Sequence, residues 1–263
     1  MMTEARPGFP GARTIDHKDL PYILEVISDY AYFDPKNRGD ALGIMAPINA
    51  DVFPPRTLEE ARTIVSKELV ERRSGVQGTI ILGRDRATGA YVSYLTARDI
   101  VIHTAAGEAI PIAYITRAVE EEHRRLHIGR ESVQQVVVKH GRARAAAVRT
   151  RNPAAVHSFE EAISWNIFPY DFVKGETAEK EGYDNDLRMR ELMVKLHFVV
   201  KSPMGEPIIW TTGVSRRDFM GENPSLEPDR GHLPTERIRE MQEGRYKMDV
   251  KRGDSQLVMA WIQ

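Results

Sequence analysis

The sequence predicts an α/β fold in which a sheet is covered by helices. Short segments rich in apolar and β-branched residues predict strands at 79–83, 90–95 and 113–119. Segments with apolar residues at helical spacing predict helices around them, at 57–69 and 128–140. Because strands and helices alternate along the chain, we expect a layered structure of sheet and helix.

The composition describes an ordinary soluble protein. Of the 263 residues, 41% are hydrophobic and 29% are charged, which is enough to bury a core. The net charge of −1 gives no sign of a nucleic-acid or anionic-membrane partner. The absence of cysteine excludes disulfides, thiolate metal sites and cysteine nucleophiles. Without a long apolar segment or a signal-peptide pattern, the sequence predicts a cytoplasmic protein.

The N-terminal part of the chain is predicted to contain one strand, one helix and a long loop. Residues 1–12 contain prolines and glycines and predict a flexible lead-in, followed by a short strand at 13–15. Asp19 is an N-cap candidate, and the apolar residues of 20–27 follow it at helical spacing, so a helix is expected there. Prolines and glycines interrupt 33–55, which predicts a long loop.

The middle of the chain carries a helix start and a hairpin. Thr57 and Glu60 have the spacing of a capping box and predict that a helix begins between them. The turn-forming residues 85–89 connect two predicted strands, and 100–102 are expected to continue the second of these.

The C-terminal half is predicted to alternate between strands and helices. Pro153 follows Asn152, a cap candidate, and begins a helix with one apolar face that extends to Ile163. A short helix is expected at 235–242. Strands are predicted at 143–148, 193–200 and 257–262.

The stretch 113–130 passes from a buried strand through an arginine-rich turn into a helix. The first backbone N–H groups of a helix have no partner within the helix, and the helix dipole is positive at that end. Both features attract anions. The sequence therefore predicts a phosphate-binding site at the start of this helix.

Two segments of the chain resemble the coenzyme A-binding region of the GNAT superfamily of N-acetyltransferases. The family pattern is Arg or Gln, two free positions, Gly, one free position, then Gly or Ala. Arg124 and Gly129 fill the first and last places, whereas His127 stands where the first Gly is usual. Residues 151–160 resemble the helix that flanks the pantetheine arm. The likeness extends over residues 13–200.

The resemblance implies a GNAT-like mixed, mostly antiparallel sheet with splayed central strands and helices on both faces. Residues 201–263 would then form a C-terminal extension that packs on or completes the domain, covers the acceptor site or forms a dimer surface. The implied activity is N-acyl transfer, by direct attack of an amine on acetyl-coenzyme A or another acyl-coenzyme A. The acceptor would be a small molecule or a protein, and no metal is required.

The resemblance also assigns site residues. The N–H of Val119 is the implied oxyanion donor, and arginines near the helix start are suited to pair with phosphates. The implied coenzyme A-binding residues are Ala118, Val119, Arg124, Arg125, Leu126, His127, Ile128, Gly129, Arg130, Asn152 and Phe159.

The general base is left open by the sequence. Glu120, Glu121 and Glu122 follow the end of the strand, and Glu120 and Glu122 are the favoured catalytic candidates together with the backbone of Val119. His103 and Tyr114 are alternatives on or near adjacent strands. A base that acts through water would also satisfy the mechanism.

Two other functions remain possible from the sequence. His127 in place of Gly, and Phe159 where the family often has a proton-donating Tyr, favour a non-catalytic GNAT-fold module that binds acyl-coenzyme A or regulates. Alternatively, the donor is a longer acyl group or an acyl carrier protein. His123 and His127 have the i, i+4 spacing of a metal pair, but they span a loop-to-helix junction without an obvious third ligand, so no metal is expected.

Overall fold

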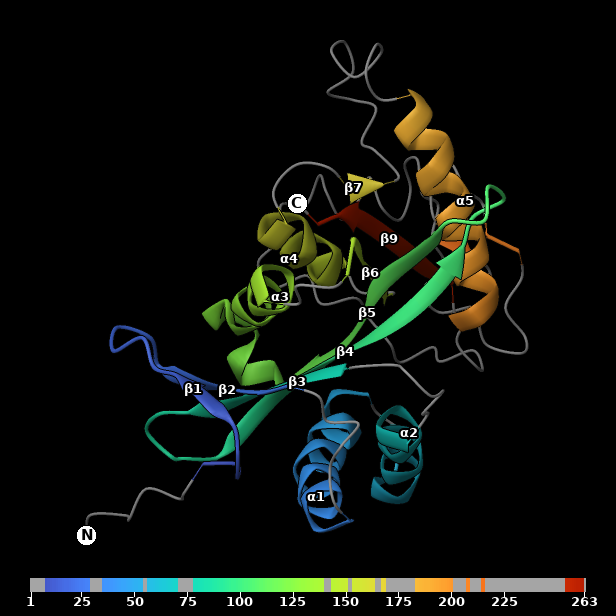
Figure 1. The fold of residues 1–263 in the computed structure, drawn as a ribbon. Helices are drawn as coiled ribbons and strands as arrows, with labels where there is room; N and C mark the ends of the chain where they lie inside the picture. The colour runs from blue at the N-terminus through green and yellow to red at the C-terminus, as the bar shows by residue number, and fades with distance from the viewer. Residues whose placement is uncertain are drawn as a thin grey trace, which may run out of the picture. The chain divides into compact units, whose positions relative to one another are not determined.

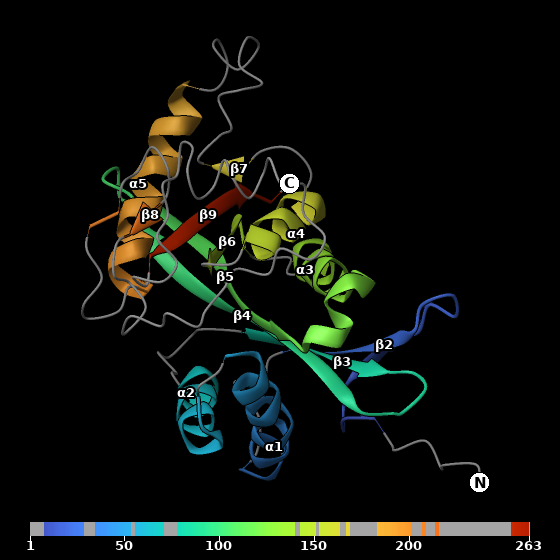
Figure 2. The same cartoon turned by 180° about the vertical axis from the view of Figure 1, so that it is seen from behind.

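The structure, a computed structural model, is a mixed α/β fold with a mostly antiparallel sheet and helices (Figures 1 and 2). The chain divides into two compact units, and strands β4 and β5 run through both. Unit 1 consists of Met1–Asp99 and Ile115–His140, and unit 2 of Ile100–Tyr114 and Gly141–Gln263. The structure describes residues 8–28, 35–53, 56–70, 78–139, 143–150, 153–163, 167–168, 183–200, 207–208, 214–215 and 254–262.

The strands of unit 1 are joined as antiparallel neighbours. β1 pairs with β2, β2 with β3 and β3 with β4, and β5 follows in the strand order. Most residues of β2 and β3 are buried, which fits their continuous apolar sequence. The bounds of these strands are Arg13–Ile15 for β1, Tyr22–Ser28 for β2, Gly78–Asp85 for β3, Tyr91–His103 for β4 and Ala109–Val119 for β5.

One face of the unit 1 strands is covered by α1 (Pro35–Val52) and α2 (Leu58–Val70). α2 begins with a capping box, because the Thr57 N–H donates to Glu60 Oε2 at 2.8 Å and the Glu60 N–H donates to Thr57 Oγ1 at 3.2 Å. The core on this face, the α1–α2 core, includes Phe9, Ile27, Ala41, Met45, Ile48, Val65, Leu69, Ile80, Leu82, Tyr94 and Ala118.

The other face of unit 1 carries α3 (Ile128–Lys139), on the opposite side from α1 and α2 (Figures 1 and 2). Side chains alternate along a strand, so Gly83 faces away from Leu82 and its core. A Cβ on Gly83 would lie 2.5 Å from Ile128 Cδ1 and would also collide with Ser93 Oγ. The first residue of α3 is therefore seated directly on β3 at a position that only glycine leaves open.

Gly83→Ala is expected to lower the free energy of unfolding by about 1–3 kcal/mol, because the added methyl group overpacks the contact between β3 and Ile128. Urea denaturation followed by circular dichroism measures this effect. The matched control is Gly43→Ala in α1, where a Cβ would meet nothing within 4 Å. That control should be neutral or stabilising, since Ala favours helix over Gly. Equal stability of the two variants would contradict the close packing of Ile128 on Gly83.

A buried carboxylate joins the N-terminal residues to the sheet in unit 1. Glu25 of β2 is 0% exposed, and its Oε1 lies 3.1 Å from Arg84 Nε. Glu25 Oε2 accepts hydrogen bonds from the Phe9 N–H and the Tyr91 hydroxyl, both at 2.8 Å. Burial, and secondarily the contact with Glu25, raise the pKa of Tyr91. Because a buried charge is tolerated only when it is paired, these contacts explain how Glu25 is accommodated.

Unit 2 contains the remainder of the sheet. β6 (Ala145–Thr150) and β9 (Ser255–Trp261) pair antiparallel along their length, and β7 (Ile167–Phe168) and β8 (Val214–Ser215) pair with β9. α5 (Tyr183–Val200) covers one face of these strands. The core on that face is formed by Ile102, Ile110, Ile112, Tyr114, Ala145, Ala147, Met189, Leu192, Met193, Leu196, Val200, Leu257 and Met259.

The opposite face of β6 is buried as well. Ala146 and Val148 alternate with the residues that face α5, so they point to the other side of the strand. α4 (Pro153–Ile163) contacts β6, and in both views it lies across β6 and β9 from α5 (Figures 1 and 2). Unit 2 thus also has helices on both faces.

Three predicted elements are wrong. The helix predicted behind Asp19 is strand β2, because apolar residues occupy both faces of a strand that is buried on both sides. The loop predicted over 33–55 contains helix α1, in which the buried face outweighs the effect of Pro47 within the helix. The strand predicted over 193–200 is the end of helix α5.

The other predicted strands and helices that the structure tests are confirmed, whereas the predicted flexible lead-in is anchored at Phe9, which is 5% exposed and donates its N–H to Glu25. The strand at 13–15, the hairpin around 85–89 with its continuation at 100–102, the central strand, the strands beginning near 143 and at 257, and the three helices are all present. Residues 1–7 and 235–242 lie outside the described part of the chain. The predicted splay of the central strands stays a prediction, as do the domain limits.

Candidate functional site

The chain turns sharply between β5 and α3. β5 ends at Val119, the 3-10 helix η2 (Glu121–Leu126) follows, and His127 then adopts a left-handed conformation with φ 59°. Among the described residues, His127 is the one non-glycine residue with positive φ. Such a conformation favours glycine and costs another residue about 1 kcal/mol.

The left-handed residue His127 stands at the position where the family pattern has glycine. Glycine at the first family position has a conformational reason here, and His127 adopts the same conformation with an exposed side chain. The His127 carbonyl accepts the Glu131 N–H at 3.0 Å, so His127 also begins the hydrogen bonding of α3. His127 is thus the residue at which the 3-10 helix η2 passes into α3.

The first turn of α3 presents backbone N–H groups. Those of Ile128, Gly129 and Arg130 have no acceptor within the helix. Ile128 is fully buried, which fixes the orientation of this turn. A Cβ on Gly129 would lie 2.8 Å from Arg117 Nη1, so glycine makes room for the guanidinium of β5.

The surroundings of this turn are positively charged. Burial lowers the pKa of Arg117 to about 10, which still leaves the guanidinium protonated at neutral pH. Nε of Arg130 is buried and has no hydrogen-bond partner among the described residues. One acidic residue, Glu131, lies in the same turn. Two guanidinium groups and the helix dipole together make this turn suited to an anion.

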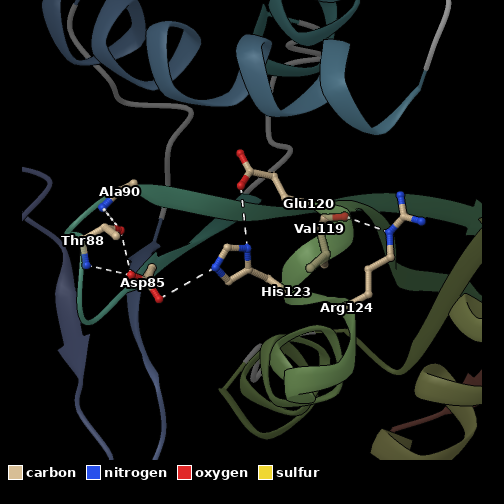
Figure 3. A network of polar contacts seen from close by, with 7 residues as sticks. All are labelled: Asp85, Thr88, Ala90, Val119, Glu120, His123 and Arg124. Atoms are coloured by element: carbon tan, nitrogen blue, oxygen red, sulfur yellow. Dashed lines mark hydrogen bonds and ion pairs between the residues drawn. The ribbon is translucent and has the colours of Figure 1, made fainter. Parts of the chain in front are cut away.

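Arg124 folds back on the end of β5. Its Nε donates to the Val119 carbonyl at 3.2 Å (Figure 3). The first residue of the family pattern thus fixes the strand end that was predicted to supply the oxyanion donor. No side-chain position is described for Arg125 or Glu121.

His123 of η2 lies between two carboxylates (Figure 3). Its Nδ1 is 3.7 Å from Glu120 Oε2, and its Nε2 is 3.8 Å from Asp85 Oδ2. These distances are those of ion pairs and exceed hydrogen-bond length. All three side chains are partly buried, with exposed fractions of 17% for His123, 32% for Glu120 and 15% for Asp85.

The position of Asp85 follows from the β3–β4 turn. The N–H and the hydroxyl of Thr88 both donate to Asp85 Oδ1 at 2.7 Å, which leaves Oδ2 towards His123 (Figure 3). These hydrogen bonds, from the Thr88 hydroxyl first, hold the pKa of Asp85 below its usual value. Gly89 closes the turn with φ 70°. Asp85 is therefore a fixed, ionised carboxylate.

Glu120 is placed by the sheet. Its N–H donates to the Val92 carbonyl at 3.0 Å, which sets the residue beside the start of β4. Burial raises the pKa of Glu120, and the nearby charges of Asp51 and Glu122 act in the same direction, whereas His123 opposes them. Glu122, the other predicted catalytic glutamate, is exposed. The structure therefore distinguishes the two candidates by environment.

The remaining predicted residues lie in different places. Ala118 is buried in the α1–α2 core, and Leu126 is half-buried in η2. Phe159 is 1% exposed in α4 of unit 2, and Asn152 lies outside the described residues. Tyr114 is buried in the core of unit 2.

Sequence reasoning missed Asp85 and Arg117, and it considered His123 only as half of a metal pair. The sequence predicts the turn at 85–89, but this turn is far from His123 along the chain, so the contact between Asp85 and His123 could not be predicted. Across the described ranges, no group of three His, Cys, Asp or Glu residues could hold a metal ion. Within the same ranges, no helix is long and apolar enough to span a membrane.

Comparison with known proteins finds similarity in structure but not in sequence. No family model and no curated protein matches the chain. It is similar to an acetyltransferase of the GNAT family from Streptococcus pneumoniae, with 14% identity over 52% of this chain and 82% of that chain and a TM-score of 0.31.

Two other solved structures are similar at the same level. Spermidine N-acetyltransferase from Vibrio cholerae, in complex with CoA and spermine, has 13% identity over 53% of this chain and 79% of that chain, with a TM-score of 0.33. Aminoglycoside 6'-N-acetyltransferase AAC(6')-Ih from Acinetobacter baumannii has 15% identity over 54% and 90%, with a TM-score of 0.35. Each of these three likenesses to an acetyltransferase extends over about half of this chain.

Proposed function

We propose that the chain is an acyl-coenzyme A-dependent N-acyltransferase that moves an acetyl group to an amine, as the resemblance in sequence implies. The observation that carries this proposal is the start of α3. There the left-handed residue His127 and the glycine at 129 begin a turn beside Arg117 whose backbone N–H groups have no acceptor within the helix. A pyrophosphate is the ligand that such a turn is suited to bind.

The proposed binding residues come from this turn. The N–H groups of Ile128, Gly129 and Arg130 would hold the phosphate oxygens, with Arg117 and the Arg130 side chain supplying charge. Arg124 fixes the end of β5 through the Val119 carbonyl. The N–H of Val119 is the proposed donor to the carbonyl oxygen of the thioester.

The reaction asks little of the protein beyond position and a proton acceptor. Acetyl-coenzyme A supplies the acetyl group as an activated thioester. Glu120 would take the proton that the acceptor ammonium must lose before its nitrogen can attack. One C–N bond forms as one C–S bond breaks. The nitrogen then gives up its second proton, which passes through water to the leaving coenzyme A thiolate, so each turnover releases the one proton that Glu120 has taken. The acceptor is proposed as a small molecule or protein amine.

One observation favours the alternative of a module that binds acyl-coenzyme A without catalysis. Phe159, at the position where the family often has a tyrosine, is buried and has no proton to donate. Turnover distinguishes the two functions. A catalyst acylates amines in a panel of polyamines, aminoglycosides and peptide N-termini, whereas a module binds the cofactor and acylates none of them.

Calorimetric titration with acetyl-coenzyme A tests the proposed function. The wild type should bind with micromolar affinity, and Arg130→Glu should weaken binding at least about 10-fold, since it replaces a charge-assisted contact with repulsion. Arg62→Glu, at an exposed position of α2, is the matched control and should bind as the wild type does. A folded wild type that binds no acetyl-coenzyme A would overturn the proposal.

A further inference from the structure

We propose that His123 and Asp85 form a proton relay with Glu120, which carries the proton taken from the acceptor amine away from the reacting nitrogen. This inference rests on the proposed function, in which Glu120 is the proton acceptor. It adds His123 and Asp85 as positioning residues that act through Glu120.

The geometry of the three side chains fits a relay. The two carboxylates face opposite nitrogens of one imidazole, at 3.7 Å on the Nδ1 side and 3.8 Å on the Nε2 side (Figure 3). A neutral imidazole can accept a proton at one nitrogen and release the proton on the other. Such contacts often tighten to hydrogen bonds only when the substrate is bound. The carboxylates do not converge on one point, which a metal site would require.

The two carboxylates are held in different states. Asp85 is kept ionised by the Thr88 hydrogen bonds, whereas burial makes Glu120 a better proton acceptor than an exposed glutamate. Carboxylates whose environments move their pKa values apart are typical of acid–base sites. Asp51 of α1 and Glu122 of η2 are the other charged groups that act on Glu120, and both favour its protonated form.

The proton balance closes within the three residues and solvent. Glu120 takes one proton from the acceptor ammonium as a carboxylate. His123 accepts that proton at Nδ1 and releases the proton of Nε2 to water, while the ionised Asp85 stabilises the charged imidazole that forms in between. Each residue returns to its starting protonation state once the imidazole has exchanged its tautomer, so no further reactant is needed.

The test compares His123→Gln with the wild type in acyl transfer to an amine found by the panel. We expect kcat/KM to fall about 100-fold, the lower end of the range for acid–base catalysis. The acid limb of its pH profile should move to higher pH, because a charged His123 lowers the pKa of Glu120. Affinity for acetyl-coenzyme A should not change. His17→Gln, at an exposed histidine outside this site, is the matched control.

Two further variants separate a relay from a structural bridge. Added imidazole should partly restore the turnover of His123→Ala. If His123 only stabilised the structure, added imidazole would not restore turnover. Asp85→Asn should lower kcat but not the affinity for acetyl-coenzyme A. This variant tests the relay if the His123 variants do not fold. Unchanged kcat/KM in His123→Gln, or no imidazole rescue in a folded His123→Ala, would overturn the relay.

The failure of the relay and the failure of the proposed function give different results. A wild type that binds acetyl-coenzyme A but acylates no amine refutes the catalytic function, and the relay with it. A wild type that turns over, beside a His123→Gln variant that turns over equally well, refutes the relay alone. Carboxyl 13C NMR titration of Glu120 in both proteins, without substrate, should show a higher midpoint in His123→Gln. Identical midpoints would count against the relay whatever the turnover.

Discussion

Glu120→Gln is expected to lower kcat by about 10²–10⁴-fold while the affinity for acetyl-coenzyme A stays that of the wild type. Glutamine has nearly the size of glutamate and keeps the backbone contact with Val92, but it cannot accept the proton of the ammonium. The effect should therefore appear in the chemical step and not in cofactor binding.

Single-turnover kinetics and calorimetry on the same preparation measure these two quantities. Glu59→Gln, at an exposed position of α2, is the matched control, because it removes the same charge away from the site. Loss of coenzyme A binding in Glu120→Gln, or retained kcat, would contradict the role of Glu120 as proton acceptor.

The raised pKa of Glu120 fixes the sign of two pH effects. As the pH falls through the raised pKa, the acceptor becomes protonated, so kcat/KM should decline at a higher pH than an ordinary glutamate would cause. Folding disfavours the ionised form, so the charge destabilises the protein above this pKa and the penalty disappears below it. Glu120→Gln should therefore be slightly more stable than the wild type at neutral pH, although its kcat is expected to be lower.

Glu25→Ala is expected to lower the free energy of unfolding by about 3–5 kcal/mol, the largest stability effect that we predict. The carboxylate is fully buried and accepts from the Phe9 N–H and the Tyr91 hydroxyl, and it pairs with Arg84. Its removal leaves a nearly buried guanidinium without this countercharge, together with two donors that lose their acceptor.

Guanidinium denaturation of Glu25→Ala beside Glu59→Ala measures this effect. The control removes a glutamate side chain from an exposed helix position and should change stability by less than about 0.5 kcal/mol. A Glu25→Ala protein as stable as the control would show that the buried ion pair gains nothing over an apolar replacement.

The sequence predicts the elements whose periodicity matches their environment. α2 and α3 have one buried face and a clear start, and both are confirmed. β2 was missed because burial on both faces removes the alternation that identifies a strand, and its apolar residues then also fit helical spacing. In α5 an apolar run at the end of the helix resembled a strand, although buried residues at 189, 192, 193 and 196 follow helical spacing.

α1 shows a different limit. Pro35 stands at the first helical position, where its missing N–H costs nothing, but a proline there also fits a loop. Only the burial of Ala41, Met45 and Ile48 against the sheet favours the helix, and such tertiary packing is invisible in local sequence.

For the site, the sequence identified the local features and missed the distant ones. The turn into α3 and the catalytic candidate Glu120 lie within one short stretch, so a linear pattern finds them. Asp85 approaches His123 only because β3 and β5 flank β4 in the sheet. Spatial proximity of this kind follows from strand order, which no spacing rule along the chain contains.

The attachment of Phe9 has a consequence for the order of events during synthesis. Its side chain belongs to a core whose other members extend to Ala118, and its N–H binds a carboxylate that Tyr91 and Arg84 also hold. Although residue 9 is made early, its binding place does not exist until the β3–β4 hairpin has emerged from the ribosome. The N-terminal segment should therefore dock late, as one of the last steps in the folding of unit 1.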